Sequence, residues 1–303
     1  MKKFLRTMLI VLLFLSGLSL LLYPFVANKW NDYRQKQLLT TYEEVIEKEG
    51  DKIDYTSEWE RAHAYNEALL PSILPDSFAI AAASEEPDEE YMACLNLAGD
   101  GMMGYVEIPK IDIKIPIYHT VTTEILEKAA GHLEGSSLPV GGESTHAVIS
   151  AHRGLPSATL FTDLDKLEEG DHFLISVLDD ILCYEVDKIS VVEPTETNDL
   201  AVEEGQDLVT LLTCTPYGVN SHRLLVRGHR VAYEPEEIDK IVDEEKPSSL
   251  TGTSLRTNYL LWVVVGLSVT AVFIMILFIR EQKLKQNVAR RNRRKNRNDN
   301  KKD

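Results

Sequence analysis

The sequence predicts a mostly-β domain, an antiparallel barrel or sandwich, that lies between two membrane-spanning helices. Six or more short segments between residues 103 and 233 alternate apolar and polar side chains, which is the pattern of half-buried strands. Two longer segments, residues 7–28 and 257–279, contain no charged residue. Each is long enough to cross a bilayer as a helix, which takes about 20 residues.

The flanks of the two apolar segments predict their orientation. Lys2, Lys3 and Arg6 precede the first segment, and a tail rich in Lys and Arg, residues 280–303, follows the second. By the positive-inside rule, both termini are expected in the cytoplasm and the protein between the spans outside the cell. A cleaved signal peptide is the alternative for the first segment, although its apolar run exceeds the usual ~7 to 15 residues.

The part between the two spans is strongly acidic. The chain carries a net charge of −16 although both of its ends are basic, so the excess of Asp and Glu lies between them. Such a surface repels a phosphate backbone, so nucleic acid is disfavoured as a partner and none is expected. The basic tail is interpreted as an orientation signal or a contact with anionic lipid.

The remaining elements follow in order from their patterns. Residues 29–50 and 57–73 have the spacing of two polar helices, and residues 74–100 have little regular pattern, as expected of a lid or linker. Helical excursions are expected at 122–130 and 158–170. The predicted division is an N-terminus with its anchor helix (1–28), helices and lid loop (29–100), a catalytic barrel (101–234), an acidic linker or helix (235–256), a second span (257–279) and a cytoplasmic tail (280–303).

Three cysteines lie in the exported part, so at least one thiol has no intrachain disulfide partner. None of their spacings is that of a zinc site. Cys183 lies in the middle of a predicted strand and is interpreted as buried filler. Acidic neighbours are expected to raise the pKa of Cys94. Cys214 ends its strand and is therefore the candidate nucleophile.

A cysteine nucleophile needs a proton carrier and a donor for the oxyanion. The chain reverses after Cys214, which brings Arg223 back beside it. Arginine stays protonated, so its fitting roles are thiolate partner and oxyanion donor. His152, at another strand end, is the candidate acid, and His222 and His229 are its rivals. From spacing alone, a structural thiol beside a surface arginine remains an equal alternative.

These residues stand in a recognisable pattern. "TLLTC", followed nine residues later by Arg223 and preceded by "SAHRG", resembles the sortase signature. "GHLEGSSLPVGGESTHAVISAHRGLPSATLFTDLD" and "LLTCTPYGVNSHRLLVRGHR" look like the class C, pilin-polymerising branch. The resemblance covers roughly residues 100 to 233. It implies an eight-stranded barrel with Cys214 as nucleophile, His152 as general acid and then base, and Arg223 holding substrate and oxyanion.

Class C sortases also carry a lid in which an Asp-Pro-aromatic motif covers the cleft. The corresponding stretch here is Asp76-Ser77-Phe78, with serine where proline is usual. Because proline stiffens a turn by fixing φ, we expect a looser lid, held by an exposed Asp76–Arg223 pair and the Phe78 ring. An ordinary turn is the alternative interpretation.

The resemblance implies a membrane-anchored cysteine transpeptidase at the surface of a Gram-positive cell. It would cleave an LPxTG-like sorting signal of a pilin subunit and join the acyl-enzyme to a lysine of the next pilin. This chemistry requires no metal or organic cofactor. The alternatives are a housekeeping sortase that attaches proteins to the cell wall, an exported cysteine hydrolase and a non-enzymatic adhesin.

Overall fold

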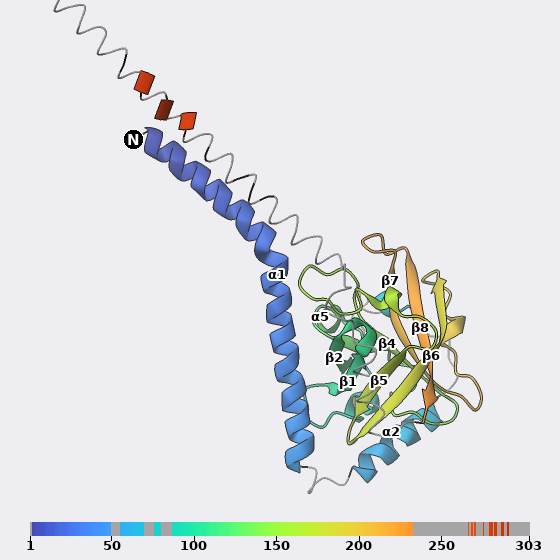
Figure 1. Cartoon of the computed structure of the whole chain (residues 1–303). Coiled ribbons are helices and arrows are strands. Elements are labelled where there is room, and N and C mark those ends of the chain that lie inside the picture. The colour runs from blue at the N-terminus through green and yellow to red at the C-terminus, as the bar shows by residue number, and fades with distance from the viewer. Residues whose placement is uncertain are drawn as a thin grey trace, which may run out of the picture. The chain divides into compact units, whose positions relative to one another are not determined.

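A computed structural model describes residues 2–49, 55–69, 76–79 and 87–232, together with isolated helical positions between 266 and 290 (Figure 1). The chain divides into two compact units, Met1–Pro247 and Ser248–Asp303. The predicted acidic linker at 235–256 lies outside the described residues. The predicted second span and tail, residues 257–303, lie largely outside them, so these parts of the division stay predictions.

Eight strands close into one barrel in the order β1-β2-β3-β4-β7-β8-β6-β5. The strands are β1 (Met102–Ile108), β2 (Ile113–His119), β3 (Ala130–His132), β4 (Thr145–Ser150), β5 (His172–Val177), β6 (Asp180–Val192), β7 (Asp207–Thr215) and β8 (His222–Val231). The predicted eight-stranded barrel is confirmed. Its pairs β2–β3 and β4–β7 are parallel, so the barrel is mixed. Alternation of apolar residues shows which face is buried, but it does not show strand direction, and the antiparallel prediction was wrong at these two pairs.

The helices are few. α1 (Lys2–Glu49) is a single helix with Pro24 inside it, α2 spans Thr56–Ala68, and α4 (Glu89–Ala93) and α5 (Thr123–Leu126) are short. Three 3-10 turns, η1 (Pro109–Ile111), η2 (Leu164–Lys166) and η3 (Asn198–Leu200), join strands. Among the described residues, Leu12–Glu44 of α1 is the one helix long and apolar enough to cross a membrane. No helix boundary falls at residue 28, where the sequence predicted one.

Other segments also differ from the sequence patterns. The helix expected at 122–130 ends at Leu126, and Ala130 begins β3, which pairs with β2 and β4. The second expected excursion, 158–170, holds the three-residue η2. Within the irregular stretch 74–100, α4 forms because the Asp88 side chain accepts hydrogen bonds from the backbone N–H groups of Glu90 and Tyr91, as an N-cap does.

The C-terminal part of α1 packs on the barrel. The Tyr42 hydroxyl donates to the Met103 carbonyl at 3.1 Å and accepts from the Leu178 backbone N–H at 3.0 Å. Leu39 and Tyr42 join a buried apolar cluster with residues of β1 and β2. The same helix that carries the apolar N-terminal segment is therefore fastened to the barrel.

The two faces of β7 contact different clusters. Val209 and Leu211 belong to the main barrel core. Leu212 belongs to a second apolar cluster, together with Leu225 of β8. Because side chains alternate along a strand, Thr210, Leu212 and Cys214 share the second face, which we call the outer face.

Candidate active site

Cys214 is the penultimate residue of β7 and lies directly opposite Arg223 of β8 in the antiparallel register. Opposite residues on antiparallel strands project to the same side, with Cβ atoms about 4.5 to 5.5 Å apart. Both residues are buried, Cys214 with 7% of its surface exposed and Arg223 with 9%. The predicted return of Arg223 to the neighbourhood of Cys214 is thus seen in the strand register.

The Arg223 guanidinium is held by the carboxylate of Asp76. Nε donates to Oδ1 at 2.6 Å and Nη2 to Oδ2 at 2.7 Å, a bidentate pair in which each side chain is 10% exposed. Nη1 donates to the backbone carbonyls of Asn220 and His222. The sequence led us to expect an exposed pair. The pair is instead largely buried, where charged hydrogen bonds stabilise more strongly.

The Phe78 ring contacts both candidate partners of Cys214. Its ring centroid is 5.2 Å from that of His152, and the Arg223 guanidinium carbon lies 5.1 Å from it. The ring also packs against the apolar cluster of Leu212 and Leu225. Residues 76–78, which we call the lid, therefore contact both the arginine and the histidine of the candidate site.

Ser77 makes a contact that the sequence did not indicate. Its side chain is fully buried, and its Oγ accepts a hydrogen bond from Ser150 Oγ of β4 at 2.8 Å. Asp76 also accepts from the Ala79 backbone N–H, which closes one helical turn after it. Ser77 lacks the fixed φ of proline, but a hydrogen bond joins it directly to the barrel. The expectation of a looser lid did not include this bond.

Burial of the covered site shifts the pKa values of Cys214 and His152 toward their neutral forms. Burial raises the pKa of the Cys214 thiol, an effect that Arg223 opposes and Asp76 reinforces. Burial lowers the pKa of His152, and the nearby Glu127 carboxylate partly offsets this. A thiol and a neutral imidazole are therefore the favoured forms while the lid is in place. Removing Asp76 from Arg223 would leave the cation to stabilise the thiolate.

The rival histidines occupy other positions. His222 lies opposite Thr215, and its Nδ1 is 2.8 Å from Ser221 Oγ. His229 lies opposite Leu208, six residues along β8 from Arg223, which corresponds to roughly 20 Å of strand. The His152 ring, in contrast, packs against the Phe78 ring of the lid.

Arg153 is a residue to which the sequence reasoning gave no role. Its Nη1 donates to Thr215 Oγ1 at 3.1 Å, its Nε donates to the Thr162 carbonyl at 3.1 Å, and its Nη2 binds Asp165. The side chain is 8% exposed. Arg153, which follows His152, thus binds Thr215, which follows Cys214. Its place within "SAHRG" was the only sequence signal available.

The other two thiols lie elsewhere in the barrel unit. Cys94 is buried after α4, where its Sγ contacts the Glu90 carbonyl and burial raises its pKa. Cys183 is buried in β6, opposite Leu174. Within the described ranges, no three His, Cys, Asp or Glu side chains are grouped as a metal site. The absence of a cofactor stays a prediction from the chemistry.

Comparisons with known proteins agree with this geometry. A family described as "Sortase domain" matches residues 106–231. Sortase C of Streptococcus pneumoniae is 46% identical, with a TM-score of 0.59, over 65% of this chain and 97% of that one. Sortase C-1 of Actinomyces oris is 44% identical, with a TM-score of 0.56, over 59% of this chain and 98% of that one. Sortase D of Bacillus subtilis is 30% identical over 42% of this chain, and the match spans 63% of that protein's length.

The closed barrel and the cysteine and arginine paired at the ends of adjacent strands agree with the comparisons, and the chain belongs to the sortase family of cysteine transpeptidases. Within that family it is similar to sortases C from several bacteria, at 42 to 46% identity. The structure of the Streptococcus pneumoniae enzyme is described as informative on pilin substrate specificity.

Proposed function

We propose that this sortase polymerises pilins. Cys214 is the nucleophile, His152 the proton carrier and Arg223 the oxyanion donor, and the lid of Asp76, Ser77 and Phe78 covers them at rest. The observation that carries the proposal is the cross-strand pair Cys214–Arg223 with Asp76 bound to its arginine. The similarity to sortases C, one of which is described with pilin specificity, supports the choice of substrate.

The reaction begins when the lid leaves. Arg223, released from Asp76, stabilises the Cys214 thiolate, and the thiol proton moves to His152. The thiolate attacks the threonine carbonyl of an LPxTG-like sorting signal. The guanidinium donates to the oxyanion of the tetrahedral intermediate. His152 protonates the leaving glycine amine, and a thioester on Cys214 remains.

A lysine amine of the next pilin then attacks the thioester. His152 accepts a proton from this amine, the Cys214 thiolate leaves, and an isopeptide bond joins the two subunits. Water competes with lysine at this stage. The apolar side chains of the outer face, Leu212 and Leu225, and a buried cysteine favour transfer because they limit access of water to the thioester.

Membrane anchoring belongs to the same proposal. The apolar segment of α1 and its packing on the barrel would hold the site near pilins that are themselves tethered to the membrane. Tethering raises the effective concentration of the two partners. Two spans, an extracellular barrel and cytoplasmic termini are the topology we propose.

The test is incubation of the full-length protein in detergent with candidate pilins and a cell-wall peptide, followed by tandem mass spectrometry. A lysine isopeptide between pilin subunits that disappears in Cys214→Ala supports pilin polymerisation. Release of a free threonine acid instead would identify a hydrolase. Transfer of the cleaved pilin to cell-wall peptide alone would identify a housekeeping sortase. Either of these outcomes would overturn the proposal.

A further inference from the structure

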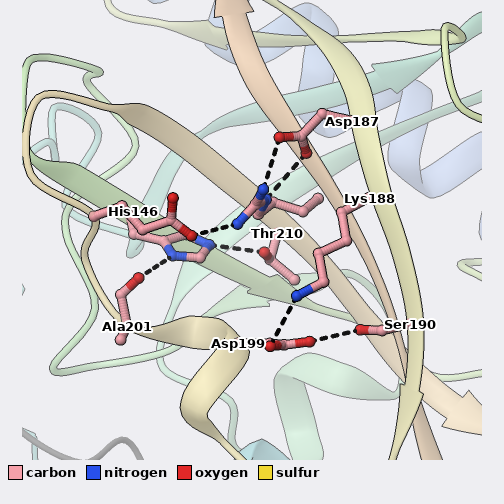
Figure 2. Close-up of polar contacts among 9 residues, drawn as sticks. His146, Asp187, Lys188, Ser190, Asp199, Ala201 and Thr210 are labelled. Carbon is pink, nitrogen blue, oxygen red and sulfur yellow. Dashed lines mark hydrogen bonds and ion pairs between the residues drawn. The ribbon is translucent and has the colours of Figure 1, made fainter.

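A polar network lies on the outer face of the barrel at some distance from Cys214, and Figure 2 shows its members. Thr210 stands four residues before Cys214 on β7, roughly 13 Å along the strand, opposite Arg227 of β8. Arg227 in turn stands opposite Lys188 of β6. The network therefore spans the strands that also carry the candidate site. It contacts the connection between β6 and β7, residues 193–206.

His146 of β4 fastens this connection at Ala201. Its Nδ1 is 2.8 Å from the Ala201 carbonyl oxygen and its Nε2 is 2.7 Å from Thr210 Oγ1 (Figure 2). Because a carbonyl oxygen can only accept, Nδ1 carries the proton and Nε2 accepts from the Thr210 hydroxyl. Burial lowers the pKa of His146, which favours this neutral form. One ring thus ties the connection to both β4 and β7.

Asp199 is a second point of attachment. Its Oδ1 is 2.9 Å from Lys188 Nζ, and its Oδ2 accepts from Ser190 Oγ at 3.0 Å (Figure 2). Lys188 and Ser190 are alternate residues of β6, so they project from the same side of that strand. The hydrogen bond from Lys188 lowers the pKa of Asp199, which keeps the carboxylate ionised.

Arg227 provides the third attachment. Its Nη1 donates to Glu203 Oε1 at 2.6 Å, while Nε and Nη2 donate to the two carboxylate oxygens of Asp187 at 3.0 and 2.8 Å. Asp187 fixes the guanidinium from the side of β6. Glu203 is the partner that belongs to the connection. The attachment of Glu203 therefore depends on Arg227, which Asp187 orients.

These three attachments enclose Leu200. The residue lies between Asp199 and Ala201, is 3% exposed, and belongs to the apolar cluster that contains Leu212 and Leu225. Leu212 is two residues from Cys214 on the same face of β7. The Phe78 ring of the lid packs against this cluster. Holding Asp199 and Ala201 therefore holds one member of the apolar cluster against which the lid packs.

We infer that His146, Asp199 and Arg227 are positioning residues for donor-peptide binding, which hold Leu200 in the apolar surface that the lid vacates. The inference rests on the proposed function, because it assigns to the donor peptide the place of the Phe78 ring. An apolar side chain of the peptide then packs on a surface whose shape is set by the polar network. Loss of an attachment loosens that surface and weakens peptide binding, while the reacting groups stay in place.

The test compares KM and kcat for a sorting-signal peptide with full-length variants in detergent. His146→Leu removes both ring contacts, whereas His146→Asn keeps a donor near the Nδ1 position. Asp199→Asn removes the ion pair with Lys188. The matched control is Lys110→Met, which breaks a Lys–Asp pair of the same 2.9 Å length, to Asp171 just before β5.

We expect His146→Leu and Asp199→Asn to raise KM about 3- to 30-fold, the range for losing one or two hydrogen bonds, with kcat changed less than about threefold. His146→Asn should recover part of the loss, and Lys110→Met should match the parent. Alkylation of Cys214 by a small reagent should be slowed in neither variant, because a loosened surface holds the Phe78 ring of the lid less firmly.

A KM within about twofold of the parent in both His146→Leu and Asp199→Asn would overturn the inference, as would a fall in kcat alone. Should His146→Leu fail to fold, Asp199→Asn and Glu203→Gln decide, because these two carboxylates are partly exposed. A parent that does not turn over the peptide overturns the proposed function itself. An active parent with unchanged variants overturns only the positioning role.

Discussion

Substituting Asp76 and Phe78 by alanine should expose Cys214 to a small thiol reagent. With the lid in place the cysteine is 7% exposed, so the reagent reacts when the lid opens. The rate then equals the open fraction multiplied by the rate of the exposed thiol. Weakening the closed state should raise the rate in proportion to the open fraction, until the lid is open most of the time.

The size of the effect follows from the contacts. A hydrogen-bonded charge pair that is largely buried, as Asp76–Arg223 is, stabilises the closed state by about 1.5 to 3 kcal/mol. Every 1.4 kcal/mol is about tenfold in an equilibrium constant, so Asp76→Ala should raise the rate about 10- to 100-fold. The partly buried Phe78 ring should add about another tenfold in the double variant. Arg223, freed of Asp76, also lowers the pKa of Cys214 and acts in the same direction.

The assay is time-resolved mass spectrometry of the full-length protein with a small alkylating reagent at neutral pH. Cys94 is an internal control because it is buried outside the lid and its rate should not change. Asp171→Ala, which removes a carboxylate from an ion pair far from the lid in sequence, is the matched variant. Rates for Cys214 within twofold of the parent in the double variant would refute the lid assignment.

The remaining predictions concern catalysis and stability. His152→Ala should lower kcat about 10²- to 10⁴-fold and Arg223→Ala about 10²- to 10³-fold, and Arg223→Lys should recover little because an ammonium lacks the planar fork. Thr215→Val, which removes the hydroxyl bound by Arg153, should lower kcat with KM unchanged, whereas Thr215→Ser should retain activity. The barrel should lose stability as the pH falls from 6.5 toward 4, because burial lowers the pKa of His132 from 6.5 to about 4. Protons then bind the unfolded chain more readily than the folded one, at a cost of about 3 kcal/mol.

Each of these has a control. Steady-state kinetics of His222→Ala should resemble the parent, and a loss equal to that of His152→Ala would mean that the wrong histidine was chosen. Equal kcat in the valine and serine variants of Thr215 would show that the hydrogen bond from Arg153 to Thr215 does not help to position Cys214. Denaturant unfolding of His132→Gln as a function of pH should be flatter than that of the parent, and parallel curves would contradict the assignment.

Local patterns predicted most of the strands because half-buried strands carry a period of two along the chain. The same logic brought Arg223 beside Cys214, because two strand ends joined by a short reversal must meet. β3 was missed because three residues cannot show a period, and its pairing depends on distant strands. The positions of its partners β2 and β4 depend on closure of the whole barrel, which no local pattern shows.

The contacts that complete the candidate site join residues far apart in sequence. Ser77 and Ser150 are separated by 73 residues, and Arg153 and Thr215 by 62. No spacing rule relates such positions, because the closed barrel alone brings them together. The burial of the Asp76 carboxylate escaped prediction for the same reason, since it depends on how the lid rests on the outer face.

The most direct test of the central claim is capture of the acyl-enzyme. The full-length protein is mixed with an LPxTG-like peptide, quenched in acid within a turnover, digested and analysed by tandem mass spectrometry. We predict a threonine acyl group in thioester linkage on Cys214. When a pilin with its acceptor lysine is added, the acyl-enzyme should disappear and the isopeptide product should form. An acyl group on any other residue, or isopeptide formation by the Cys214→Ala variant, would contradict the account.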